Sequence, residues 1–476
     1  GDETTHGEGY NMQQIPKNEQ GLFGQVTAQF GESYVLHTPK ALRNALRSGG
    51  LRVNHPCKAG PFYLLMPINT QPEMISPLNL EALPGLPNFP LTSVSDNEQL
   101  EKAFTLIRNS FKIVIKAGGG SCKFAEKVKQ LAETCSIPVV LSPGSTGVLP
   151  DQHPLNMHVG GSKGTISGNY AMANAELLVV IGSRAVCQSD CSGIGYEKVT
   201  DVINLNHDLI DVAHYNRTVL LPGDIGATLD KLLQIFKKAP AEINDNKKSW
   251  LNHCADSKRE WYEFKQERFN CPPIKDEAWK RPVLTQPSAI KVVADFARKI
   301  NAVKYFDAGD VQANGFQIVE DDSPSETYTE SGASYMGFAP SALAASALAD
   351  QPQYGICFCG DGSFMMNPQI LIDAVELGVK GMIVIFDNRR MSAITGLQEA
   401  QYGAGFKTND SVEIDYVSMA NAVKGVEAFF GGESTSELKS TLEKAYTHQG
   451  LSVIHVPVYY GDNPLGGMGA YGSWNV

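Results

Sequence analysis

Two stretches of the chain alternate short apolar segments with amphipathic segments, and this alternation restricts the fold more than any other feature. Alternating strands and helices build parallel sheets, because each helix carries the chain back to the edge where the next strand starts. In the first stretch, helices are predicted at 97–110, 122–134 and 168–173, and strands at 112–116, 138–142, 175–181 and 199–205. The sequence therefore predicts an α/β fold with doubly wound parallel sheets.

Composition further divides the chain into segments. The first contains one predicted helix within 38–50, which is expected to end before Gly49 and Gly50, and one predicted strand at 60–67. One helix and one strand cannot form a core alone, so this segment is interpreted as the tail end of an α/β domain. The predicted segments are 1–80, a central α/β segment at 93–236 after a proline-rich stretch, a charged helical linker at 237–283, and a second alternating segment at 284–476.

Charge and composition exclude several classes of protein. The formal net charge of −11, without a basic stripe, argues against binding to nucleic acid. No run of eighteen apolar residues predicts a membrane span, and the first residues have neither the basic start nor the apolar core of a signal peptide. The nine cysteines form neither a disulfide framework nor zinc-ligand spacing, so we expect free thiols in a reducing cytoplasm.

The segment Cys359–Gln369 (CGDGSFMMNPQ) places an acid, Asp361, between two glycines directly after a predicted strand at 355–359. The carboxyl end of a parallel strand is where α/β sheets bind ligands, and a helix expected near Pro368 would favour an anion there. The small residues Gly360, Gly362 and Ser363 would let the backbone approach a diphosphate. The alternative is an ordinary corner, with glycines for unusual backbone angles and Asp361 as a helix cap.

The next predicted strand, at 381–386, delivers Asp387 and Asn388 to the same edge of the sheet. A carboxylate from Asp361 and an amide oxygen from Asn388 would supply part of the oxygen shell that Mg²⁺ prefers, with diphosphate and water completing it. The matched pair favours a magnesium–diphosphate site over a plain corner.

These residues resemble the signature of thiamine-diphosphate enzymes, which usually runs from Gly-Asp-Gly to Asn-Asn. Asp307–Gln312 resembles the first diphosphate-contacting turn of that family, and Ser334–Pro340 resembles the segment that supports the bent cofactor. Motifs at 164–169, 175–183 and 222–224 resemble the central domain of acetohydroxyacid synthase relatives. The resemblance implies a thiamine-diphosphate-binding fold with a central Rossmann-like domain, preceded at 1–80 by the C-terminal remnant of a pyrimidine-binding domain.

The resemblance also implies a set of site residues. Asp361, Asn388 and the carbonyl of Arg390 would bind Mg²⁺, and Met336 would be the apolar wedge beneath the cofactor, the alternative for Met336 being a buried core methionine. The cofactor-binding residues implied are Ala308, Gly309, Asp310, Val311, Ser334, Met336, Gly360, Gly362 and Ser363.

Two departures concern acids. Asp387 stands where the family usually has Asn, and Asp310-Val311 stands where acetohydroxyacid synthases commonly have Gln-His. An extra acid near a diphosphate is unfavourable unless it is hydrogen-bonded or turned away.

Within the superfamily, Ser392–Gln398 and the terminal Tyr471–Val476 are similar to segments of trihydroxycyclohexanedione hydrolases. The implied function is thiamine-diphosphate- and Mg²⁺-dependent cleavage or formation of a C–C bond in a small-molecule substrate, a cyclic dione or a 2-oxo acid. The alternatives are an acetolactate synthase-like carboligase and a catalytically silent scaffold or regulatory subunit. Because the family places its cofactor between two subunits, the resemblance implies a homo-oligomer, a dimer or a tetramer.

The family's activating glutamate has no counterpart between residues 1 and 75. Glu3, Glu8 and Glu19 lie in polar, irregular sequence, so the catalytic residue is unassigned. Truncation or cleavage of the chain, a separate N-terminal polypeptide, and loss of catalysis are the three explanations that remain open. Four histidines of the central segment are predicted to be superficial or structural: His153, His158, His207 and His214.

Overall fold

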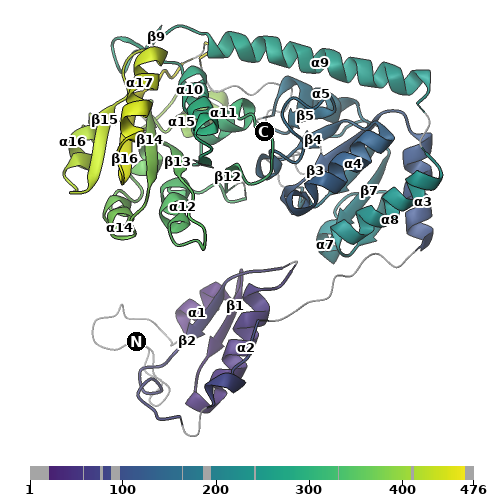
Figure 1. The fold of residues 1–476 in the computed structure, drawn as a ribbon, viewed down its shortest axis with the longest axis horizontal. Helices are drawn as coiled ribbons and strands as arrows, with labels where there is room; N and C mark the ends of the chain where they lie inside the picture. The colour runs from purple at the N-terminus through teal and green to yellow at the C-terminus, as the bar shows by residue number, and fades with distance from the viewer. Residues whose placement is uncertain are drawn as a thin grey trace. The chain divides into compact units, whose positions relative to one another are not determined.

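The computed structural model divides into two units, residues 1–92 and 93–476 (Figure 1). Residues 21–56, 58–75, 79–86, 97–162, 164–185, 195–240, 243–330, 332–408, 412–461 and 463–466 are described. Within these ranges, no helix is both long enough and apolar enough to cross a membrane.

The first unit contains one more strand than the sequence predicted. Its elements are α1 (Leu22–Thr27), β1 (Glu32–Val35), the 3-10 turn η1 (Pro39–Ala41), α2 (Leu42–Val53), β2 (Phe62–Leu65) and η2 (Leu80–Ala82). β1, missed because it is short and begins with polar residues, pairs in parallel with β2. Helix α2 does not end before its glycines as predicted: it continues past Gly49, where a Cβ would lie 2.9 Å from the ring of Phe62. The glycine therefore allows close helix–strand packing.

The central part of the second unit is a six-stranded parallel sheet of order β5-β4-β3-β6-β7-β8. Its strands are β3 (Ile113–Ala117), β4 (Val139–Leu141), β5 (Asn156–Val159), β6 (Leu177–Ile181), β7 (Asp201–Asn206) and β8 (Thr218–Pro222). Its helices and turns are α3 (Asn97–Asn109), η3 (Gly119–Phe124), α4 (Ala125–Cys135), η4 (Pro143–Ser145), α5 (Ile166–Asn174), α7 (Leu209–Val212) and α8 (Ile225–Lys238). β3 and β6 are buried along their whole length, as expected for strands covered on both faces.

The second six-stranded parallel sheet has the order β12-β11-β13-β14-β16-β15. Its strands are β11 (Val303–Phe306), β12 (Thr327–Thr329), β13 (Gly355–Gly360), β14 (Gly381–Asp387), β15 (Val426–Phe430) and β16 (Leu451–Pro457). Its helices are α10 (Gln286–Lys299), α11 (Asp310–Ile318), α12 (Phe338–Ser346), α13 (Asp361–Phe364), α14 (Ile370–Glu376), α15 (Ser392–Tyr402), α16 (Tyr416–Asn421) and α17 (Thr435–Tyr446). Separate apolar clusters on the two faces of this sheet form its core.

The predicted α/β class with parallel sheets is confirmed, and one detail at the corner differs. The helix predicted near Pro368 is present, and an additional helical turn, α13, precedes it and begins at Asp361. The longer helix α14 follows at Ile370. The corner is therefore tighter than predicted, and Asp361 is the first residue of a helical turn.

Helix α9 (Asp245–Phe269) runs from the central sheet to the second sheet (Figure 1). Near its start, Trp250 Nε1 donates to the carbonyl of Ile113 at 3.1 Å. Near its end, Arg268 donates to the side chains of Gln317 and Asn314, both at 2.7 Å. Two short antiparallel strands, β9 (Ile274–Lys275) and β10 (Pro282–Val283), follow α9.

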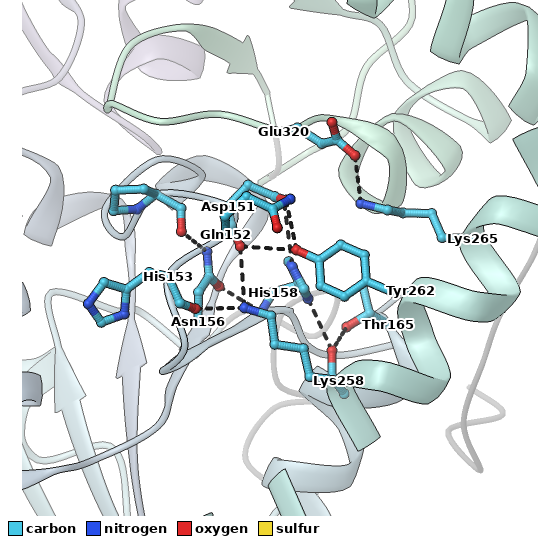
Figure 2. Close-up of polar contacts among 12 residues, drawn as sticks. Asp151, Gln152, His153, Asn156, His158, Thr165, Lys258, Tyr262, Lys265 and Glu320 are labelled. Carbon is cyan, nitrogen blue, oxygen red and sulfur yellow. Dashed lines mark hydrogen bonds and ion pairs between the residues drawn. The ribbon is translucent and has the colours of Figure 1, made fainter. Parts of the chain in front are cut away.

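A set of charged and polar side chains, termed the junction cluster, links α9 to both sheets (Figure 2). Its members are Asp151, His158, Lys258, Tyr262, Lys265 and Glu320. Lys265, which is 1% exposed, pairs with Glu320 at 2.9 Å, and Tyr262 donates to Asp151 at 3.0 Å. Because α9 contributes three of the members, this helix holds the two sheets together through buried polar contacts as well as apolar ones.

Candidate cofactor site

The carboxyl ends of β11, β13 and β14 open into a cavity of about 920 Å³. These three strands are neighbours in the sheet, so the turns that follow them lie side by side. The cavity is lined by all twelve residues that the sequence proposed for cofactor or metal: Ala308, Gly309, Asp310, Val311, Ser334, Met336, Gly360, Asp361, Gly362, Ser363, Asn388 and Arg390. Four segments separated along the chain therefore line one cavity.

Asp361 and Asn388 reach the cavity from the adjacent strands β13 and β14. Both side chains are buried, with exposures of 4% and 5%. The side-chain oxygen of Asn388 accepts the backbone N–H of Arg390 at 3.1 Å, which closes the turn after β14. Among the described residues, no three His, Cys, Asp or Glu side chains gather as a metal site. A cation here would therefore rely partly on neutral oxygens, such as that of the Asn388 amide.

The shape of the wall fits a diphosphate held by such a cation. Gly309 has φ +85°, and a Cβ at Gly309 or Gly360 would meet no atom within 4 Å, so the backbone at both positions is open to an approaching group. At Gly362 a Cβ would lie 3.1 Å from Met391 Sδ and 3.2 Å from the terminal methyl of Met336. Hard oxygen donors beside an accessible backbone match the needs of Mg²⁺ and phosphate oxygens.

Asp307 holds the turns of the cavity together, a role that the sequence did not reveal. Its fully buried carboxylate accepts the backbone N–H groups of Ala308 (2.8 Å), Gly337 (3.0 Å) and Ala339 (2.8 Å). Burial raises the pKa of Asp307, and these N–H groups with the Ser363 hydroxyl act in the opposite direction. The carboxylate thus ties the turn after β11 to the segment carrying Met336.

A second network shapes the loop before Met336. Gln312 on α11 donates to Thr329 Oγ1 and to the carbonyl of Glu330, both at 2.7 Å, and accepts from Ser334 at 3.0 Å. The Glu330 carboxylate accepts backbone N–H groups of the same loop, including that of Ser334. The predicted residue Ser334, with φ +54°, is therefore held by polar contacts on both sides.

The two acids that depart from the family pattern are both engaged by neighbours. Asp387 accepts the backbone N–H of Arg389 at 2.9 Å and lies 2.9 Å from Nε2 of His455. Asp387 does not line the cavity. Asp310 does line it, and its carboxylate accepts a hydrogen bond from the hydroxyl of Ser392.

Some lining residues were not proposed from the sequence. Ser162 comes from the central part of the unit, while Gln286 and Phe316 come from α10 and α11. Ile394 and Leu397 come from α15, three residues apart on one helical face. The segment of α15 stood out in the sequence only by resemblance, and its i, i+3 apolar spacing was the available signal.

Other predicted residues lie elsewhere. Of the four histidines of the central segment, none lines the cavity: His153 pairs with Glu133, His158 with Asp151 and His207 with Asp224, and His214 packs on Tyr215. Glu3, Glu8, Glu19 and the terminal segment 471–476 fall outside the described residues.

Two family models match the chain. The central domain of thiamine pyrophosphate enzymes matches residues 100–232, and their C-terminal TPP binding domain matches residues 307–456. The second match begins directly after β11 and contains the strands β13 and β14 and the turns that line the cavity.

The relatives include two kinds of enzyme. The large subunit of acetolactate synthase isozyme 1 from Escherichia coli (strain K12) is 26% identical over 422 residues, covering 86% of this chain and 69% of the relative. The 3D-(3,5/4)-trihydroxycyclohexane-1,2-dione hydrolase of Listeria monocytogenes serotype 4b (strain F2365) is 25% identical over 444 residues, covering 88% and 68%. A probable acetolactate synthase large subunit from Methanocaldococcus jannaschii is 26% identical over 392 residues, covering 80% and 63%. The chain thus spans about two thirds of the length of these relatives.

Proposed function

Because the chain carries the central and C-terminal domains of a thiamine pyrophosphate enzyme, we propose that it binds thiamine diphosphate with Mg²⁺ and makes or breaks a C–C bond. The observation that supports this most is the convergence of the predicted residues on one cavity at the ends of three adjacent strands. The relatives include acetolactate synthases and trihydroxycyclohexanedione hydrolases, which supports our proposal that the substrate is a 2-oxo acid or a cyclic dione.

In the proposed mechanism the residues of this chain bind the cofactor and the metal ion and orient them. Asp361, Asn388 and the carbonyl of Arg390 would hold Mg²⁺, while the turns at 308–311 and 360–363 would hold the diphosphate. Met336 would support the cofactor rings, and apolar side chains of α15 would keep water from the reacting atoms. Bound thiamine diphosphate would supply a nucleophilic ring carbon and accept the electron pair left by bond cleavage.

Cofactor binding is tested by calorimetric titration of thiamine diphosphate with Mg²⁺ present or chelated. We expect binding that depends on Mg²⁺ and is lost in Asp361→Asn. Asp373→Asn, the same change at an exposed position on α14, is the matched control and should bind like the wild type. Absence of binding by the folded wild-type protein would refute the proposal.

The substrate class is tested by incubating the loaded protein with pyruvate and, separately, with cyclic 1,2-diones. Acetolactate as product identifies a carboligase, whereas a ring-opened acid identifies a hydrolase. Both reactions start from the same bound cofactor, so this experiment separates two substrates within one proposed mechanism.

A second candidate is a cofactor-binding protein without turnover. It is favoured by one observation: residues 1–75 hold no counterpart of the glutamate that this family uses to activate its cofactor. Exchange of the cofactor's C2 proton in deuterated water decides between the two. Rapid exchange supports the enzyme, and tight binding without exchange supports the silent protein.

We also propose that the chain assembles with a second copy, because the family completes its cofactor site between subunits. Light scattering coupled to size exclusion, with and without thiamine diphosphate and Mg²⁺, measures this. A dimer or tetramer is expected, and a monomer that binds cofactor fully would contradict it.

A further inference from the structure

Three buried polar side chains at the cavity form a chain of hydrogen bonds. Asn388 Nδ2 donates to Ser392 Oγ at 3.0 Å, and the Ser392 hydroxyl donates to Asp310 Oδ2. Their exposures are 5%, 6% and 8%. A serine hydroxyl has one hydrogen, so giving it to the carboxylate leaves its oxygen free to accept from the amide. The chain therefore has one direction, from Asn388 to Asp310.

This direction fixes the orientation of the Asn388 amide. With its N–H₂ turned to Ser392, its oxygen faces the opposite side, where it accepts the backbone N–H of Arg390. A flipped amide would direct its own N–H at that N–H and would place a donor where a cation needs an oxygen. Ser392 and Asp310 therefore select the orientation of Asn388 that a metal ligand requires.

These hydrogen bonds from Asn388 through Ser392 to Asp310 also join two parts of the cavity wall. Asp310 is the first residue of α11, after β11, whereas Asn388 follows β14 directly and Ser392 is the first residue of α15. A negative charge in the first turn of a helix is stabilised by the free N–H groups there. The carboxylate is further satisfied by Ser392, so an acid is tolerated beside the proposed diphosphate position.

We propose that Asp310 and Ser392 are positioning residues that hold the amide oxygen of Asn388 ready for Mg²⁺, an inference that rests on the proposed function. Outer-shell partners of metal ligands typically change metal affinity by about 10–100-fold when they are removed. The two residues act through Asn388. Removing either of them therefore lowers the affinity for Mg²⁺ and affects the reaction of the substrate only through the metal ion.

The test measures the dissociation constant of Mg²⁺ by calorimetry at saturating thiamine diphosphate. Ser392→Ala is expected to raise the dissociation constant of Mg²⁺ by about 10-fold or more. Ser392→Thr, which keeps the hydroxyl, should retain most of the wild-type affinity. The matched control is Thr395→Val, one turn along α15, which removes a buried hydroxyl that lies 2.7 Å from Thr408 Oγ1. It should lower the unfolding temperature without changing Mg²⁺ affinity.

Asp310→Asn separates positioning from direct ligation. If Asp310 only positions Asn388, Asp310→Asn lowers the affinity for Mg²⁺ in the wild-type background. It adds little to the effect of Ser392→Ala, because that variant has already broken the series of hydrogen bonds. If Asp310 binds the cation itself, the two effects add, and the inference is overturned.

The inference is also overturned if folded Ser392→Ala binds Mg²⁺ like the wild type while the wild type needs Mg²⁺ for the cofactor. In that case the proposed function stands and only the positioning role fails. A wild-type protein that binds neither Mg²⁺ nor cofactor overturns both.

Discussion

Nε2 of His455 lies 2.9 Å from Oδ2 of Asp387, so the carboxylate of the last residue of β14 is directed to the neighbouring strand β16. This relationship explains how an acid occupies a position where the family usually has asparagine.

Asp387→Asn should therefore change stability and leave metal binding intact. The amide keeps a bond to the Arg389 N–H but loses the charged partner of His455, and we expect a loss of about 1–2 kcal/mol in the free energy of unfolding. Denaturant unfolding measures the loss of stability, and a titration with Mg²⁺ measures the affinity for the cation. A large fall in Mg²⁺ affinity would place Asp387 in the metal site instead.

Gly309→Ala tests whether the backbone of the turn after β11 must keep its unusual conformation. Gly309 has φ +85° and ψ −147°, a region almost restricted to glycine, so alanine should cost about 1–3 kcal/mol of stability. Thiamine diphosphate binding should weaken as well, because the turn faces the cavity.

Gly378→Ala provides the matched control for Gly309→Ala. Gly378 has φ +66° and follows α14, and a Cβ added there would meet no atom within 4 Å. Alanine at this position should therefore cost about 1–2 kcal/mol through the backbone alone. Equal loss of cofactor binding in both variants would mean that Gly309 matters only for stability.

His158 should make the protein sensitive to mild acid. Burial lowers its pKa from 6.5, helped by Lys265 and Lys258 and opposed by Asp151, within a cluster that also holds Tyr262. The unfolded chain then binds a proton at a higher pH than the folded protein does. As a result, the stability that neutral His158 allows is complete above about pH 6.5 and falls as pH drops below it, by at most about 1.4 kcal/mol per pH unit.

The variant His158→Asn should flatten this dependence between pH 7 and pH 5. Denaturant unfolding at several pH values gives the two slopes. Parallel curves for wild type and variant would show that His158 does not contribute to the acid sensitivity.

The ion pair between Lys265 and Glu320 should be costly to break from either side. Lys265→Met is expected to cost about 3 kcal/mol, the low end for a buried pair, because Lys291 remains 3.4 Å from the carboxylate. Glu320→Gln should cost more, since it leaves Lys265 buried without its carboxylate. The double variant should lose less than the sum of the two single losses.

An exposed ion pair is the control for this prediction. Lys299 and Glu443 pair at 2.7 Å with exposures of 66% and 62%, so Lys299→Met should leave the free energy of unfolding close to that of the wild type. If Lys265→Met were equally mild, the junction cluster would not be what holds α9 in place.

The sequence was sufficient for the parts of the fold that depend on local pattern. Strands such as β13 and β14 are short apolar runs bounded by glycine and acid, and that pattern predicts both the strand and the edge at which its last residue emerges. Asp361 and Asn388 were found because their positions follow from one repeating unit of strand and helix. Resemblance to a family supplied the rest of the proposed site.

Contacts between distant segments could not be predicted in this way. Asp307 accepts from Gly337, 30 positions away, and Ser392 donates to Asp310, 82 positions away. Such partners depend on how turns pack once the sheet exists. Helix α2 likewise runs through Gly49 because a ring from β2 fills the space beside it, which local helix preference does not report.

Because the strands of the second sheet are parallel, the connections at their carboxyl ends and those at their amino ends differ in role. The turns that could bind cofactor follow the carboxyl ends, while the connections into the amino ends, such as residues 348–353, are exposed on the opposite edge. A peptide tag or fluorescent label inserted at 348–353 would report on the folded protein without entering the cavity. Loop length can therefore vary at the amino ends of the strands, whereas at the carboxyl ends each turn contacts its neighbours and is constrained by them.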